Sequence, residues 1–213
     1  VENSTGTSAR QYSSGSAIVS NDTAILYSPN TTGLFVFTGE NTRPPNTMTI
    51  GAQNVAMLQM NLVPTAQKDI VVNRLVVTNF GTAAPPVNAR GSLYFDANRN
   101  GLLDGPDTAI QTNVNFVGSR VVFTNMNLFI PAVSNKYVIF VSDFTNANLG
   151  TYVAQVRGER CLATAYGIPT YVRNLAASMT QTVVGPIDHF RIAHDGIGYR
   201  NVTERVVFSA RDS

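Results

Sequence analysis

The chain has 213 residues, 44% of them hydrophobic, which is enough to form one large domain or two small ones. Its formal net charge is only +2, and charged residues make up 13% of the sequence, about half the usual share. Positive charge this sparse argues against nucleic-acid binding. The sequence also contains no apolar run of about 18 residues, so we expect no membrane span.

Asn, Thr, Ser and Gly take the surface positions that charged residues usually hold, a composition typical of exported proteins that pack into layers or fibres. Because the chain begins at Val1, we expect that a signal peptide was removed or that the chain was shortened. N-glycosylation sequons begin at Asn3, Asn21, Asn30 and Asn201. They become surface sites if the source organism glycosylates its exported proteins.

Residues 1–15 are nearly all small and polar and have no apolar core of their own. Two interpretations remain open: a disordered terminus, or an extended arm that becomes ordered only against another molecule. Beyond this segment, short apolar runs end at turn residues such as Asn21, Pro44 and Pro131. We expect strands at residues 17–19, 24–27, 33–37, 48–50, 55–63, 69–78, 91–95, 108–111, 114–116, 120–124, 127–130, 136–141 and 150–156.

This pattern predicts an all-β fold in which only residues 174–179 suit a turn of helix. One sheet cannot bury so much apolar surface, so we expect two facing sheets, an antiparallel β-sandwich of the jelly-roll or immunoglobulin-like kind. We assign this domain to residues 16–185, with an N-terminal arm at 1–15 and a β-hairpin at 186–213.

The most specific motif is an oxygen-rich loop that follows the expected strand at residues 91–95. Its oxygen side chains have the spacing of a calcium loop, and Gly101 falls where such loops turn sharply. The predicted ligands are Asp96, Asn98, Asn100, the main-chain carbonyl of Leu102, Asp104 and Asp107. A solvated turn without metal is the alternative, because Asn, Asp and Gly dominate turns in general.

Strands flank this loop where an EF-hand has helices, so the expected calcium ion stabilises a sheet rather than acting as a sensor. Asp107 stands where the EF-hand consensus has Glu, as in loops that resemble the dockerin type. The order of elements from Val55 to Val156 resembles a recurrent β-sandwich module of secreted prokaryotic surface proteins. The resemblance rests on the strand Met57–Leu62, the Leu-Tyr-x-Asp strand with its loop, and a later Gly-x-Tyr strand.

Residues 187–198 and 204–212 resemble the first two strands of an immunoglobulin-like module common in bacterial surface proteins. The pattern in that module is His-Phe-x-Ile-x-His-Asp-Gly, then a short link, then Glu-x-Val-x-Val-x-Ala-x-Asp, which corresponds here to residues 204–212. An isolated hairpin is not stable, so its apolar residues need a partner sheet. These residues are Ile187, Phe190, Ile192, Val206 and Phe208. Either the natural chain continues past Ser213, or the hairpin packs on its own domain or on another copy.

This layout resembles extracellular prokaryotic filaments built by strand donation, such as archaeal threads, bundling pili and cannula tubules. The resemblance implies a secreted structural subunit whose partners are copies of itself, with other surface proteins or glycans as further partners. The alternative is a carbohydrate-binding or adhesion module of a larger surface protein. Its stacking residues would be Tyr27, Tyr94, Tyr166, Tyr171 and Tyr199.

Enzyme chemistry finds little support in the sequence. His189 and His194 lie five residues apart on an expected strand, which places them on opposite faces. No Cys/His cluster suits zinc, and the single cysteine, Cys161, is predicted to be a small buried residue rather than a reactive thiol. A carboxylate pair that meets only in the fold leaves a hydrolase as the third possibility. Because no nucleophile, zinc or phosphate-binding pattern occurs in the sequence, our prediction is that the protein is not an enzyme, with the hydrolase as the least favoured hypothesis.

Overall fold

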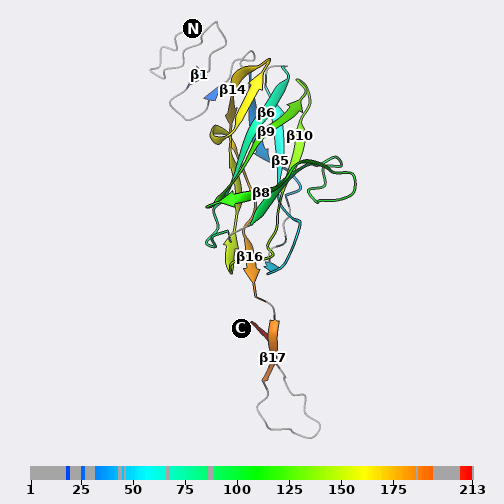
Figure 1. The fold of residues 1–213 in the computed structure, drawn as a ribbon, viewed down its shortest axis with the longest axis vertical. Coiled ribbons are helices and arrows are strands. Elements are labelled where there is room, and N and C mark those ends of the chain that lie inside the picture. Colours follow the sequence, from blue (N-terminus) through cyan, green and yellow to red (C-terminus); the bar gives the residue numbers. More distant parts are fainter. Residues whose placement is uncertain are drawn as a thin grey trace, which may run out of the picture.

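Figure 1 shows the computed structural model, which describes residues 18–19, 25–26, 32–42, 45, 47–65, 68–85, 89–185, 187–193 and 207–212. The predicted N-terminal arm at 1–15, the four sequons and His194 lie outside these residues. Within them, the regular structure is all strand apart from one 3₁₀ turn, η1 (Gly158–Arg160). The prediction of an all-β fold is confirmed.

The strands are β1 (Ile18–Val19), β2 (Ile25–Leu26), β3 (Gly33–Thr38), β4 (Thr47–Thr49), β5 (Val55–Pro64), β6 (Ile70–Asn79), β7 (Arg90–Phe95), β8 (Thr108–Val117), β9 (Arg120–Ile130), β10 (Lys136–Ser142), β11 (Gly150–Tyr152), β12 (Ala154–Arg157), β13 (Leu162–Ala165), β14 (Ile168–Arg173), β15 (Leu175–Ala177), β16 (Gln181–Val184), β17 (Ile187–Ala193) and β18 (Val207–Asp212).

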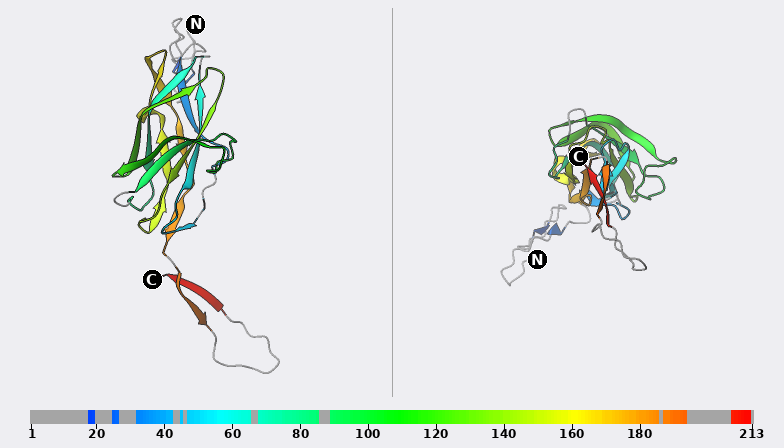
Figure 2. Two further views of the ribbon diagram at one scale, coloured as in Figure 1. Left: turned by 45° about the vertical axis from the view of Figure 1, so that its right-hand side comes forward. Right: turned by 90° about the horizontal axis from the view of Figure 1, so that it is seen from below.

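Hydrogen bonding closes nine of these strands into a barrel. The order around the ring is β13-β14-β3-β5-β10-β7-β8-β9-β6, and β6 pairs with β13 to complete it. We expected two facing sheets, but β8 and β14 join them into one ring. β3, β5, β10 and β7 form one wall, β9, β6 and β13 form the other, and β8 and β14 each pair with a strand of both walls. Seen from below, the strands surround a common core (Figure 2). The long strand β6 makes closure possible because it pairs along both of its edges.

Four smaller groups of strands lie outside the ring. β12 and β15 extend from the free part of β6, and β11, β16 and β4 form a separate three-stranded sheet. β1 pairs with β2. β17 and β18 form the predicted C-terminal hairpin, which lies beyond β16 and clear of the barrel (Figures 1 and 2).

Asparagine explains where the predicted strands differ from the observed ones. Asn113, Asn125 and Asn127 have positive φ values of 58°, 55° and 48° and lie within β8 and β9. We expected breaks at Asn113 and Asn125, and a new strand beginning at Asn127. All three residues occupy irregular positions that interrupt the pairing of a strand without ending it. The segment expected to allow a turn of helix contains β15 instead, and the expected strand at 150–156 divides into β11 and β12.

The core lies between the two walls of the barrel. Phe123 of β9 and Phe140 of β10 meet edge to face with ring centroids 6.3 Å apart, which joins the opposite walls. Met48, Met57 and Met60 are buried, as expected for methionines that fill a core.

Replacing Phe123 by alanine tests this core. Its side chain is 0% exposed, so Phe123→Ala is expected to lower the free energy of unfolding by about 3–5 kcal/mol, because it leaves a cavity. Phe129 lies on the same strand but is 48% exposed, so Phe129→Ala is the matched control and should cost less than half as much. Urea denaturation measures both. Equal losses would contradict the placement of Phe123 in the core.

Candidate functional site

The predicted ligand loop begins at Asp96, directly after β7. The Asp96 carboxylate is 1% exposed and is held from two sides. Its Oδ2 accepts hydrogen bonds from the side-chain amide of Gln59, at 2.6 Å, and from the main-chain N–H of Gly101, at 3.0 Å. Its Oδ1 accepts one from the N–H of Asn100, at 3.2 Å. This network fixes the first predicted ligand in one position.

The remaining side chains of the loop converge on one another. Asn98 and Asn100 each accept a main-chain N–H with the side-chain oxygen, at 3.1 and 2.8 Å, and both amide nitrogens donate to Oδ2 of Asp104, at 2.9 and 2.6 Å. Asp107 accepts from the main-chain N–H groups of Ala97 and Asp104, at 3.1 and 3.0 Å. The structure therefore brings five predicted ligand side chains together.

Gln59 organises this site and was not predicted to belong to it. It lies on β5 and faces away from the barrel core, yet its side chain is 1% exposed because two loops cover it. Besides donating to Asp96, it accepts the main-chain N–H of Asn41 at 3.0 Å. Its main-chain N–H and C=O both bond to the hydroxyl of Thr42, at 3.0 Å. Alternation along β5 indicates that Gln59 faces outward, but not that anything covers it.

The segment that follows β3 packs directly on the ligand loop. Asn41 donates its side-chain N–H to the carbonyl of Arg99, at 2.6 Å. A Cβ atom at Gly101, where φ is +75°, would lie 2.0 Å from the carbonyl oxygen of Asn41. Glycine is therefore required here both for its backbone conformation and for this close approach.

The carboxylates of Asp96, Asp104 and Asp107 form no ion pair with a Lys or Arg of the described chain. The loop offers carboxylate and side-chain amide oxygens as possible metal ligands, with the carbonyl oxygen of Leu102 as a further predicted ligand. Such a set of oxygens suits a hard cation such as calcium. Within the described ranges, however, no group of three or more His, Cys, Asp or Glu side chains is close enough to hold a metal ion. The amides of Asn98 and Asn100 direct nitrogen toward Asp104, so calcium binding requires them to rotate.

Cys161 has no feature of a reactive thiol. It is buried and donates a hydrogen bond to the carbonyl of Arg157 at 3.5 Å. Burial raises the pKa of the Cys161 thiol to about 11, and the opposing influence of the Arg74 guanidinium is smaller. The thiol therefore stays protonated at neutral pH, which agrees with the prediction of a structural role.

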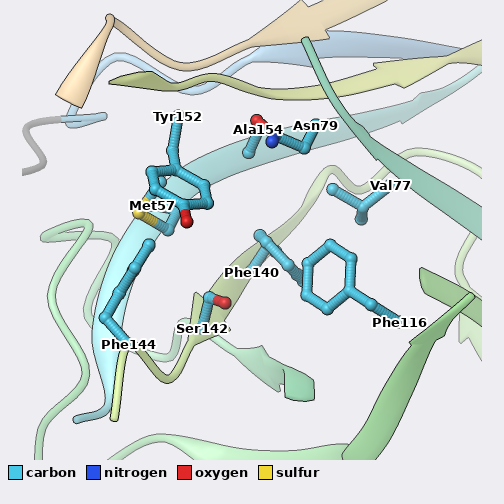
Figure 3. Close-up of a pocket in the computed structure, with 9 residues that line it drawn as sticks. All are labelled: Met57, Val77, Asn79, Phe116, Phe140, Ser142, Phe144, Tyr152 and Ala154. Atoms are coloured by element: carbon cyan, nitrogen blue, oxygen red, sulfur yellow. The ribbon is translucent and has the colours of Figure 1, made fainter. Parts of the chain in front are cut away.

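An apolar crevice opens between the walls of the barrel near β11 (Figure 3). The rings of Phe144 and Tyr152 meet there edge to face at 5.0 Å, and the Tyr152 hydroxyl donates to the carbonyl of Asn148 at 3.0 Å. Burial raises the pKa of the Tyr152 phenol, so it remains a donor. The crevice has a volume of about 20 Å³, far too small for a ligand.

Comparison of the sequence with protein-family models and with curated proteins gave no match. In the part of the chain that the structure describes, no helix has the length and apolar character needed to cross a membrane.

Replacing Gln59 by alanine tests its role in holding the two loops. Gln59→Ala removes one of the three hydrogen bonds to the buried Asp96 carboxylate and the acceptor of the Asn41 N–H, so it is expected to destabilise the protein by about 1–3 kcal/mol. Gln53 is exposed and bonds only weakly to Thr145, so Gln53→Ala should change stability by less than about 0.5 kcal/mol. Urea unfolding checks both, and equal effects would contradict the proposed role of Gln59.

Proposed function

We propose that this protein is a subunit of an extracellular filament or surface layer that joins to copies of itself by strand exchange, with calcium bound in the 96–107 loop. The main supporting observation is the hairpin β17–β18. Its strands pair with each other and with no other strand of the described chain, and the hairpin lies clear of the barrel (Figure 2). A two-stranded hairpin is marginal alone, so a partner surface would stabilise it.

The barrel offers strand edges to which a second copy can bind. β8 and β9 pair only at Phe116–Val121 and Val117–Arg120, so beyond these pairs their facing edges have no strand partner in the described residues. Ile110, Val114 and Met126 lie along this seam and are only half-buried against the core. β-Bulges in both strands limit the segment that an added strand can pair with.

The strand arrangement agrees with this role. The two walls of the barrel pack face to face, so we retain the jelly-roll or immunoglobulin-like sandwich as the finer description of the fold within this proposal. A head-to-tail contact between such subunits that does not close into a ring produces a filament. Secretion follows from the same proposal.

Calcium would act as a stabiliser of the barrel wall. The ligand loop is anchored through Gln59 to β5, a strand inside the ring, and it has no helix pair that could open or close. Asp96, Asn98, Asn100, Leu102, Asp104 and Asp107 would supply the oxygen ligands. The cation would offset two of the three negative charges of carboxylates that form no ion pair within the described residues.

An adhesion or carbohydrate-binding module of a larger surface protein is the second candidate. The connection between β16 and β17 favours it, because only residues 185 and 186 separate the last strand beside the barrel from the hairpin. These two residues are Gly and Pro, and domain boundaries often fall in linkers rich in these residues.

The calcium part of the proposal predicts a higher melting temperature in calcium than in EDTA. At a calcium concentration about 100 times the Kd, the added stability is about 2.7 kcal/mol. Asp104→Asn should reduce this shift. Asp143→Asn is the control, because Asp143 lies outside the loop and its side chain, among the described residues, accepts only the N–H of Asn54. Identical melting curves in calcium and EDTA would contradict calcium binding.

The assembly part predicts that deleting residues 187–213, or residues 1–15, yields subunits that no longer form fibres, because a donor segment is lost. Negative-stain microscopy and sedimentation of the intact and shortened chains provide the measurement. Fibres from both shortened chains would rule out strand exchange. Monodisperse intact protein that is retained on a glycan column would instead favour the adhesion module.

A further inference from the structure

A groove lies on the outer face of the barrel wall formed by β6, β9 and β13. The proposed function does not use it. The groove has a volume of about 300 Å³. Its charged lining residues are Arg74, Arg120, Arg160 and Glu159, and its apolar ones are Val76, Val122 and Leu162.

Strand register places these side chains together. Arg74 of β6 is paired with Leu162 of β13, and Val76 of β6 is paired with Val122 of β9. Two residues further along, Thr78 is paired with Arg120. Alternate residues of a strand face the same side, so all of these side chains share the outer face of the wall. The turn η1 then adds Arg160 at the rim.

The base of the groove is apolar although it faces outward. Val76 is 2% exposed and is not part of the barrel core, so the side chains around the groove are what cover it. Leu162, in contrast, is 57% exposed and forms an apolar side of the groove. A ligand here meets hydrocarbon below and guanidinium groups around it.

The charge of the groove is concentrated and unpaired. Three arginines and one glutamate give a local charge of +2, equal to the formal net charge of the whole chain. None of the three guanidinium groups forms an ion pair or a side-chain hydrogen bond within the described chain. Guanidinium groups with free donors bind carboxylate and sulfate oxygens strongly, in paired hydrogen bonds.

We propose that this groove binds an acidic saccharide, through a carboxylate or sulfate group held by Arg74, Arg120 and Arg160. The C–H face of a sugar ring would pack on Val76, Val122 and Leu162. The volume lies at the small end of ligand sites, which suits one or two sugar units. A nucleic-acid strand fits less well, because the arginines surround one cavity instead of following a backbone.

Binding measurements on the intact chain test this site with defined probes. Calorimetry would compare oligogalacturonate, which carries carboxylates, with heparin oligosaccharides, which also carry sulfate, and with neutral dextran and inorganic sulfate. We expect binding of at least one acidic oligosaccharide and none of dextran. Arg74→Gln combined with Arg120→Gln should weaken that binding about 10–100-fold, because two charged hydrogen-bond donors are lost.

Arg173→Gln is the matched control, since Arg173 is exposed, lies over the ring of Tyr171 outside the groove, and carries the same charge. It should weaken binding less than twofold.

If the double variant fails to fold, Arg160→Gln on η1 tests the same groove. Equal loss in the groove and control variants would show general electrostatic attraction and overturn the site. Inorganic sulfate binding as tightly as the oligosaccharides would show an adventitious ion only, and no binding at low salt would also overturn the proposal.

Discussion

The two-sided pairing of β6 is the constraint on which the rest of the structure depends. β6 bonds to β9 along one edge, and to β13 and then β12 along the other, so it closes the ring. The pairing of β6 shifts register at Asn73, both with β13 and with β9. Val72 and Leu75 both face the core although they are three residues apart, because the irregularity at Asn73 inserts an extra residue and reverses the faces that follow. The same shift turns Arg74 outward.

Both candidate sites lie where the barrel wall carries a second layer. On one wall, the loops at 39–42 and 96–107 cover Gln59, and on the other, η1 and the arginine side chains cover Val76. Gln59 and Val76 are buried although they face away from the core. Each site therefore rests on a strand of the closed ring, which holds the loop or turn above it in a defined position.

Much of the fold was predictable from local sequence. Apolar runs bounded by turn residues placed β3, β5, β6, β7 and β10 to within one residue at each end, because their side chains alternate or are continuously buried. Closure was not predictable, because it depends on pairing between β6 and β13, which are distant in the chain. The breaks expected within β8 and β9 were wrong because Asn serves both in turns and in bulges.

The ligand loop and the groove differ in how far sequence reveals them. The spacing of Asp96, Asn98 and Asn100 is local, so the motif identified the residues that converge. Gln59 was missed because its partners come from two separate loops. The groove was missed for a stronger reason: Arg74, Arg120 and Arg160 come from three elements, and only the register of the barrel brings them together.

The two sites place opposite charges on opposite walls of the barrel. Three carboxylates lie in the loop over β5, and three guanidinium groups lie around the groove over β6. A bound calcium ion would cancel most of the charge of the loop while leaving that of the groove unchanged. The calcium-bound protein would then keep a basic groove on one wall, while the negative charge of the loop on the other wall is largely offset. An acidic partner would for this reason be attracted to the β6 wall, and a calcium-stabilised surface protein would gain a defined side for contact with acidic glycans.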